Sequence, residues 1–263
     1  MNEERVWQTV QKARSNTRPT ASKLLSFLVK DFVELHGDRY FGDDPSIIAG
    51  IGTLKDLPIT IIAQEKGTTT PSKIQHHFGM PHPEGYRKAL RIAALAAKFH
   101  QPIFFIIDTP GAYPGIGAEE RGQAQAIAKN LFELIALPVP IVCLILGEGG
   151  SGGALALGIG DQVWMMEHAI YSILSPEGFA SILYKDASLA KKVAVHMKIT
   201  AQDLYDYHLI DLIIKENEQF ESQPETVFSP LSEQLYTTFL SLQKLDISVL
   251  LEKRYQKYRK MGQ

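Results

Sequence analysis

A glycine-rich run is the part of this sequence best suited to chemistry. Residues 147–160 read GEGGSGGALALGIG and follow directly on the apolar residues 140–146. Glycines let a chain turn sharply and bring its backbone N–H groups close to a ligand, with no side chain in between. The free N–H groups at the start of a following helix can then stabilise a negative charge. The run therefore indicates either an oxyanion-binding site or a plain tight turn between a strand and a helix.

Two other segments carry polar groups that could act beside this run. Residues 106–120 contain Asp108 and two Pro-Gly pairs, and they too leave an apolar run through a glycine-rich turn, so the two turns could face each other across one site. A longer polar stretch around Lys66 and Arg87 offers cations that could bind phosphate or carboxylate groups. Composition alone favours simpler roles for these residues. Asp108 and the Pro-Gly pairs would only shape a turn, and Lys66 and Arg87 would be solvated surface charges.

Composition excludes several classes of function. The chain has 263 residues, 45% of them hydrophobic and 21% charged, which is typical of a folded globular protein. A net charge of -2 gives no general attraction for nucleic acid or an anionic membrane. No apolar run reaches the ~20 residues of a transmembrane helix, and the polar N-terminus lacks the layout of a secretory signal, so we expect a cytoplasmic protein. With Cys143 as the only cysteine and no companion ligands for His76 and His77, we expect no metal in this chain.

The elements that must position these residues follow from the apolar pattern. Uniformly apolar runs suit strands that are covered on both faces, whereas apolar residues at helical spacing predict the helices between them. Strands that alternate with helices imply an α/β fold with crossover connections. The predicted strands cover 59–63, 102–107, 140–146, 162–166 and 169–174; the predicted helices cover 84–99 and 119–136; the lead at 1–30 and the tail at 232–260 are predicted to be helical, and 215–230 is the best linker candidate.

Several long strings occur in an order that resembles one known family. They are QEKG at 64–67, FGMPHPEGYRKALR at 78–91, IDTPGAYPGIGAEERGQAQAIAKNL at 107–131, GEGGSGGALALGIGD at 147–161 and SPEGFASIL at 175–183. Together they resemble the alpha subunit of bacterial acetyl-CoA carboxylase carboxyltransferase. The resemblance runs from about Asp31 to Lys215, and the terminal RYQKYR also fits. It implies three segments: a helical lead (1–30), a crotonase-like carboxyltransferase domain (31–215) and a helical tail (216–263).

The resemblance also implies an activity. The family transfers the carboxyl group of carboxybiotin, held on the biotin carboxyl carrier protein, to acetyl-CoA and forms malonyl-CoA for fatty acid biosynthesis. It implies a partner beta subunit that carries a zinc site, an alpha2beta2 assembly, and cooperation with biotin carboxylase. By motif match, backbone amides of Gly152, Gly153 or Ala154 would bind the biotin ureido oxygen. Substrate contacts would come from the following residues: Lys66, Tyr86, Arg87, Gly115, Ile116 and Gly117.

Two alternatives stay open at this point. Residues 149–153 fit the G-x-S-x-G pattern of a serine hydrolase, with Ser151 as nucleophile. A run so rich in glycine meets that pattern easily, however, and flexible neighbours position a nucleophile poorly. The chain could also act on an acyl-CoA other than acetyl-CoA, since that choice would depend on the partner's pocket. Possible triad partners of Ser151 are Asp161, His168, Asp186, His196 and His208.

Overall fold

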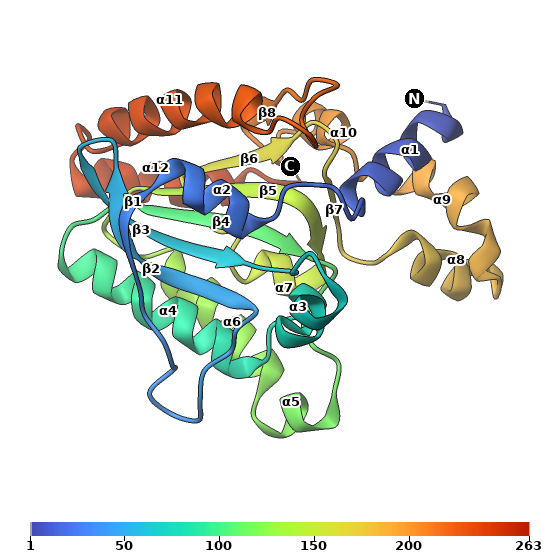
Figure 1. Ribbon diagram of the computed structural model, residues 1–263, viewed down its shortest axis with the longest axis horizontal. Helices are drawn as coiled ribbons and strands as arrows, with labels where there is room; N and C mark the ends of the chain where they lie inside the picture. The colour runs from blue at the N-terminus through green and yellow to red at the C-terminus, as the bar shows by residue number, and fades with distance from the viewer. Residues whose placement is uncertain (1, 263) are drawn as a thin grey trace.

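A sheet of eight strands runs through the centre of the molecule (Figure 1). The computed structural model describes residues 2–262. The strands are β1 (Lys30–Glu34), β2 (Ile47–Leu54), β3 (Leu57–Gln64), β4 (Ile103–Thr109), β5 (Ile141–Gly150), β6 (Gln162–Met166), β7 (Ile170–Ser172) and β8 (Leu212–Ile214). Their order is β1-β2-β3-β4-β5-β6-β8, and β7 pairs with β5. From β3 onward all neighbours are parallel, whereas β1, β2 and β3 are antiparallel.

The uniformly apolar runs form the central strands, as predicted. Every residue of β4 is buried, and so are the first seven residues of β5. Strands buried on both faces need helices above and below them. The α/β fold class is therefore confirmed. The glycine run differs from its prediction in one respect, because β5 continues through Gly150 before the chain turns.

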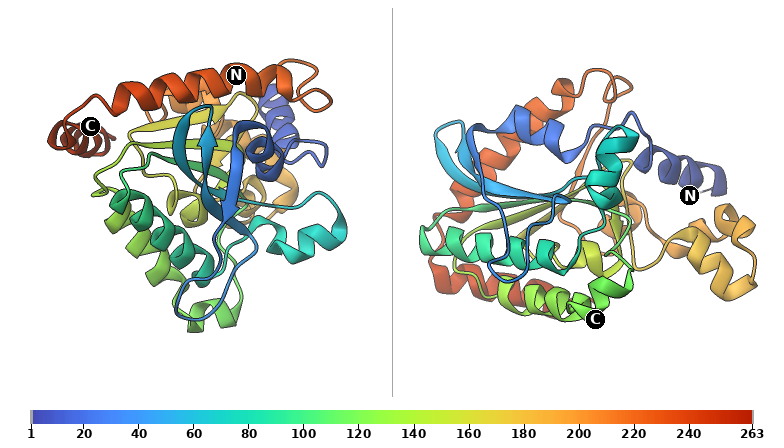
Figure 2. Two further views of the ribbon diagram at one scale, coloured as in Figure 1. Left: turned by 60° about the vertical axis from the view of Figure 1, so that its left-hand side comes forward. Right: turned by 60° about the horizontal axis from the view of Figure 1, so that its bottom comes forward.

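Helices cover both faces of the sheet (Figure 2). On one face lie α4 (Pro83–Lys98) and α6 (Gln123–Leu134), which pack against each other. On the other lie α2 (Ala21–Leu28) and α11 (Glu225–Leu242), which also contact each other. The prediction of one helix over 119–136 was wrong. The structure has a short α5 (Ile116–Glu120) and then α6, because Gly122 between them adopts the left-handed conformation with φ 83°.

The C-terminal tail consists of two helices that pack on the body. The predicted linker at 215–230 is shorter than expected, because α11 already begins at Glu225. In α11, Phe228, Leu235 and Phe239 are fully buried in the main core. In α12 (Ile247–Arg259), the guanidinium of Arg254 is buried against Asp161 at 2.7 Å and donates to backbone carbonyls at the end of α6. The tail is therefore part of the folded body.

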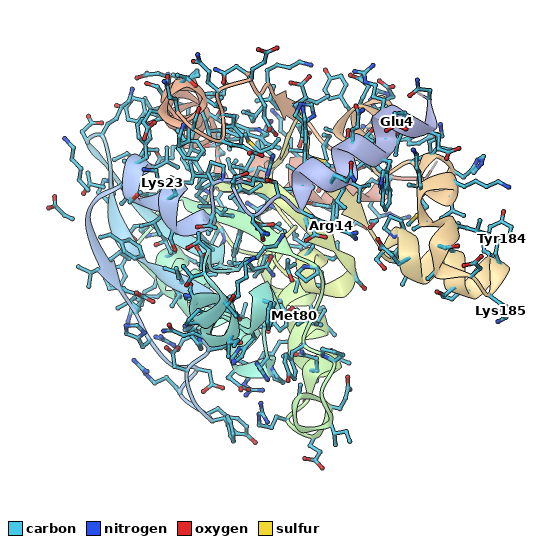
Figure 3. All side chains as sticks on the ribbon, turned by 45° about the vertical axis from the view of Figure 1, so that its right-hand side comes forward. Glu4, Arg14, Lys23, Met80, Tyr184 and Lys185 are labelled. Atoms are coloured by element: carbon cyan, nitrogen blue, oxygen red, sulfur yellow. The ribbon has the colours of Figure 1, made fainter. Side chains whose placement is uncertain are left out.

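Three helices form an arm beside the sheet (Figure 3). They are α1 (Glu3–Ala13), α8 (Pro176–Tyr184) and α9 (Ala190–Met197), and α9 packs on both α1 and α8. Figure 3 shows Tyr184 and Lys185 at the outer end of the arm. Short helices complete the chain: α3 (Thr70–Gln75), η1 (His77–Gly79), α7 (Ser151–Leu155), η2 (Ala187–Leu189) and α10 (Ala201–Asp206). Within residues 2–262, no helix is long and apolar enough to cross a membrane.

Candidate active site

The turn from β5 into α7 presents free backbone N–H groups. Gly150 is the residue before the helix, and α7 begins at Ser151, whose φ of 54° reverses the chain direction sharply. In a helix that starts this way, the N–H groups of the first turn have no acceptor within the helix. Gly152 and Gly153 are the second and third residues of α7, so their N–H groups are the available donors. Ala154 is the fourth, where the carbonyl of Gly150 is the usual helical acceptor.

The two glycine-rich turns pack directly on each other, whereas the sequence suggested that they could face each other across one site. A Cβ atom added at Gly150 would lie 2.1 Å from the carbonyl oxygen of Pro110, and one added at Gly153 would lie 2.5 Å from the backbone nitrogen of Ala112. Real side chains do not fit at such distances. Glycine is therefore needed at both positions so that the loop after β4 can pack on the start of α7.

Gly153 is fixed from two further sides. Its carbonyl oxygen accepts a hydrogen bond of 2.9 Å from Nε2 of buried Gln64 at the end of β3. The hydroxyl of Tyr86 lies 3.0 Å from the position of an added Cβ at Gly153. Tyr86 is completely buried, and that burial raises its pKa well above the usual value. Gln64 and Tyr86 thus fix the turn that carries the free N–H groups from its buried side.

A large apolar groove begins at this turn. It has a volume of about 1040 Å³ and separates α7 from the arm. Ser151 and Gly152 form part of its wall, while Gly153 is buried behind them. The apolar side chains that line the groove include Leu155, Tyr171, Ile173, Phe179, Ile182 and Met197. Free N–H donors at the edge of an apolar space can bind a partly buried oxyanion, because little water competes with them there.

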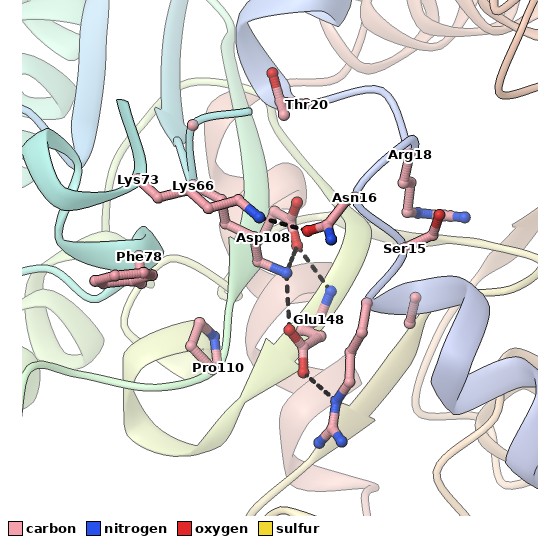
Figure 4. A pocket seen from close by; sticks show the side chains of 13 residues that line it. Ser15, Asn16, Arg18, Thr20, Lys66, Lys73, Phe78, Asp108, Pro110 and Glu148 are labelled. Carbon is pink, nitrogen blue, oxygen red and sulfur yellow. Dashed lines mark hydrogen bonds and ion pairs between the residues drawn. The ribbon is translucent and has the colours of Figure 1, made fainter. Parts of the chain in front are cut away.

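A network of charged side chains lies beside the carboxyl ends of the central strands (Figure 4). The ammonium of Lys66 is 2.7 Å from Asp108 and 2.9 Å from Glu148, and Arg14 is 2.8 Å from the same glutamate. Arg14 also reaches Glu177, at the start of α8, at 2.7 Å. Arg14, Lys66, Asp108 and Glu148 line a second pocket of about 230 Å³, together with residues such as Phe78. The network joins the ends of three strands to the arm.

The pKa shifts in this network follow from burial and charge together. Burial alone would lower the pKa of Lys66, but the carboxylates of Asp108 and Glu148 raise it, so the ammonium stays charged. For Glu148, burial opposes ionisation, yet Lys66 and Arg14 lower its pKa. Burial dominates at Asp108 and raises its pKa despite the ion pair. Lys66 is thus occupied by two carboxylates of its own chain.

The other predicted substrate-binding residues lie in different surroundings, and their role stays a prediction. Arg87 donates to Asp38 at 2.7 Å and to the carbonyl of Arg121 at 3.0 Å. Tyr86 is buried beneath α7. Gly115 directly precedes α5 and Ile116 and Gly117 begin it, at the far end of the loop that follows β4, and Ile116 is exposed. The structure therefore does not gather these residues around the groove.

Ser151 has no catalytic partner among residues 2–262. Its side chain is exposed, and no hydrogen bond from its hydroxyl to a histidine or carboxylate is present in that part of the chain. Among the possible triad partners, His196 lines the same groove as Ser151. Asp161 instead pairs with Arg254 at 2.7 Å, and the ring of His168 lies 3.2 Å from the ammonium of Lys12. The sharp turn thus resembles that of a hydrolase only in its backbone.

Sequence reasoning missed the charged network and the groove. Asp108 stood in a segment already singled out, but neither Glu148 nor Arg14 was linked to Lys66. A usable signal existed, because Asp108 and Glu148 lie at the carboxyl ends of adjacent parallel strands and must approach each other. The groove has no such signal, since its walls come from separate parts of the chain.

Comparisons with known proteins agree on one family. A family model described as acetyl co-enzyme A carboxylase carboxyltransferase-like matches residues 2–262. The carboxyl transferase subunit alpha of Halalkalibacterium halodurans is 51% identical over 98% of this chain and 79% of its own length. That of Clostridium perfringens is 51% identical over 96% of this chain and 94% of its own. The chain spans 45% of the Clostridium tetani protein named subunits beta/alpha, at 51% identity over 98% of this chain.

Solved structures share the fold at low sequence identity. Transcarboxylase 12S has a TM-score of 0.67 at 16% identity. The match covers 86% of this chain and 43% of the transcarboxylase chain. The beta subunit of Pseudomonas aeruginosa geranyl-CoA carboxylase has a TM-score of 0.62 at 14% identity. The match covers 90% of this chain and 48% of the geranyl-CoA carboxylase subunit. These likenesses show a crotonase-like carboxyltransferase fold. Together with the family match over nearly the whole sequence, they show that the chain belongs to the family of acetyl-CoA carboxylase carboxyltransferase alpha subunits.

Proposed function

We propose that this chain forms half of a carboxyltransferase active site, in which the carboxyl group of carboxybiotin passes to acetyl-CoA. The observation that carries the proposal is the pair of N–H groups at Gly152 and Gly153, which have no acceptor within α7, with Gly152 on the wall of the apolar groove. Relatives at about half identity bear the name of this enzyme's alpha subunit, which supports the choice of substrates. The product would be malonyl-CoA, which serves fatty acid biosynthesis.

The residues at the turn fit the ureido group of biotin. That group is planar and carries one carbonyl oxygen, and it needs N–H donors and an apolar surface for the rest of the bicyclic ring. Gly152 offers a donor with no side chain over it, since the nearest atoms to an added Cβ are methyl groups of Ile127 at 3.7 and 3.8 Å. The groove, of about 1040 Å³, has room for the ring.

Carboxybiotin would supply the carboxyl group and, as that group leaves, a ureido oxygen on which negative charge develops. The N–H groups of Gly152 and Gly153 would donate to this oxygen. Because Gln64 and Tyr86 hold Gly153 in place, the donors need no rearrangement when the charge appears. Fixed donors of this kind stabilise a transition state more than the ground state. No serine nucleophile or acid–base pair is required from this chain.

The second half of the site would come from a beta subunit. The Clostridium tetani relative is named for both subunits, which supports an association between them. The beta chain is proposed to hold coenzyme A and to carry a zinc site, in an alpha2beta2 assembly served by the biotin carboxyl carrier protein and biotin carboxylase. An acyl-CoA other than acetyl-CoA remains the alternative substrate, because this half of the site does not hold the acyl group.

Reconstitution tests the proposal. Malonyl-CoA decarboxylation in the presence of free biotin is measured with this chain alone, with the cognate beta subunit alone, and with both. We expect activity only in the mixture, since each chain would hold half of the site. Full turnover by the isolated chain would contradict the two-subunit proposal. Propionyl-CoA and acetyl-CoA compared as carboxyl acceptors in the mixture decide between the two substrates.

A further inference from the structure

Three potential metal ligands come together on two loops far apart in the sequence. Asp44 lies between β1 and β2, His77 opens η1, and His82 precedes α4. One ligand atom from each of the three lies within 4.8 Å of the others. Asp44 is buried, and both histidines are partly buried. The spacing of these residues in the sequence gives no signal, because Asp44 is more than thirty positions from His77.

The distances between the ligand atoms suit a tetrahedral ion. Nδ1 of His77 is 3.2 Å from Nδ1 of His82 and 3.2 Å from Oδ1 of Asp44, and Nδ1 of His82 is 3.8 Å from Oδ2 of Asp44. Zinc bound tetrahedrally to two imidazole nitrogens holds them about 3.3 Å apart, given zinc–nitrogen bonds of about 2.0–2.1 Å. One ion placed between the three groups would need only small adjustments.

Surrounding groups fix the orientation of the ligands. Oδ1 of Asp44 accepts from the backbone N–H of Ser46 at 2.9 Å and from its hydroxyl at 2.7 Å. The ring of His82 stacks on Tyr113 with centroids 4.0 Å apart, and the ring of His77 stands edge-on to that of His82 at 4.3 Å. Ligands held in this way by neighbouring groups are a feature of protein metal sites.

We propose that Asp44, His77 and His82 bind one zinc-like divalent cation through one carboxylate oxygen and two imidazole nitrogens. The side chain of His77 is 31% exposed, so water can reach the cluster and would supply the fourth ligand. The two-histidine, one-carboxylate set suits zinc better than calcium or magnesium, which prefer oxygen ligands. The ion would join the loop between β1 and β2 to the loop before α4.

The full chain, purified without a beta subunit and stripped with a chelator, is titrated with Zn²⁺ by calorimetry. We expect one equivalent to bind, and Co²⁺ to give the intense visible absorption of a four-coordinate site. The H77N H82N double variant is expected to lose both signals. Asparagine is chosen because His77 has a φ of 51°, and asparagine tolerates this left-handed region.

His208→Asn is the matched control, because His208 is exposed, has a φ of 58° and lies outside the cluster. It should bind zinc as the parent does. The single variant His82→Asn repeats the test should the double variant fail to fold by circular dichroism. Absence of saturable zinc binding by the parent would overturn the proposal, as would equal binding by the parent and a folded H77N H82N or H82N variant. In those outcomes the three residues form only a hydrogen-bonded cluster.

Discussion

Gly152 and Gly153 are neighbours in one turn, but their surroundings give them different tasks. Gly153 has backbone atoms of the loop after β4 within 2.6 Å of an added Cβ, so its small size serves packing. Gly152 has only ordinary contacts around such an atom and lines the groove. A substitution at Gly152 can therefore probe binding, whereas one at Gly153 disturbs the fold.

Gly152→Val should inactivate the reconstituted enzyme while the chain stays folded. Valine keeps the backbone N–H, but its branched side chain would hinder the approach of the ureido oxygen to the donors, and loss of one oxyanion interaction costs about 100-fold or more in kcat. Gly153→Ala should instead lower the melting temperature, because its methyl group would overlap backbone atoms 2.5 Å away. Decarboxylation rates and thermal melts of both variants check this. A Gly152→Val enzyme with the parent's rate would contradict the proposed donor.

Ser151→Ala should retain most of the activity. The serine hydroxyl has no acid–base partner in the part of the chain that the structure describes, so its loss removes no nucleophile. A triad enzyme would lose activity by about 10⁶-fold on the same change. The rate of a folded Ser151→Ala variant and labelling of the parent by a fluorophosphonate decide the question. Labelling at Ser151 would favour the hydrolase reading.

Asp43 should stabilise the fold in a pH-dependent way. Burial alone would raise its pKa, but Lys88, whose completely buried ammonium lies 2.6 Å away, helps to lower it from 3.8 to about 2. A lowered carboxyl pKa contributes stability that is present above pH 3.8 and is lost as the pH falls toward 2. Urea unfolding of the parent and Asp43→Asn should differ at neutral pH and converge across this window. A constant difference at every pH would disprove the linkage.

At the scale of elements, the apolar runs predicted the central strands well. Buried parallel strands are read from continuous apolar segments, and residues 162–166 form β6 with the predicted bounds. The break between α5 and α6 could not be predicted in this way. It depends on the left-handed conformation of Gly122, and helical spacing of apolar residues continues on both sides of it.

The candidate site was only partly predictable, again for physical reasons. The glycine run predicts a backbone that another group can approach closely. In the structure, the two glycine-rich turns pack on each other. Side-chain partners across the fold leave no local pattern. Lys66 looked like a free cation in sequence, whereas it is held by Asp108 and Glu148 from two other strands. The cluster of Asp44, His77 and His82 was missed for the same reason.

Arg14 should hold the arm to the sheet. It bridges Glu148 at the end of β5 and Glu177 at the start of α8, whereas Glu148 keeps Lys66 when Arg14 is removed. In Arg14→Ala, amide hydrogen exchange in residues 176–184 should accelerate up to about fivefold, which corresponds to about 1 kcal/mol. Exchange in β4 should not change.

Lys191→Ala is the control for Arg14→Ala, because Lys191 of α9 pairs with Glu4 of α1, which is another contact within the arm but at a solvent-exposed position. Its exchange should match the parent, since exposed ion pairs contribute little. Equal exchange in all three proteins would show that Arg14 does not secure α8. Mass spectrometry of peptides from both regions makes the comparison within one sample.

At the scale of the whole molecule, the arm exposes an apolar surface that the chain itself does not cover. Ile182, Leu183 and Tyr184 at the end of α8 are all exposed, and Ile173 precedes the helix with its side chain largely in solvent. Exposed apolar residues that gather beside a groove typically mark an interaction surface. We therefore expect the proposed beta subunit to cover this end of the arm.

Leu183→Asp should weaken association with the beta subunit and leave this chain equally stable. Its side chain is 57% exposed and does not line the groove, so a charge there costs little in the free chain. Burying that unpaired charge at an interface is unfavourable by several kcal/mol. Phe99→Asp is the matched control, since Phe99 is 61% exposed at the end of α4, on the main body. Sedimentation velocity of each variant mixed with the beta subunit should show dissociation only for Leu183→Asp. Should Phe99→Asp dissociate while Leu183→Asp stays assembled, the interface would lie on the body of the fold instead of the arm.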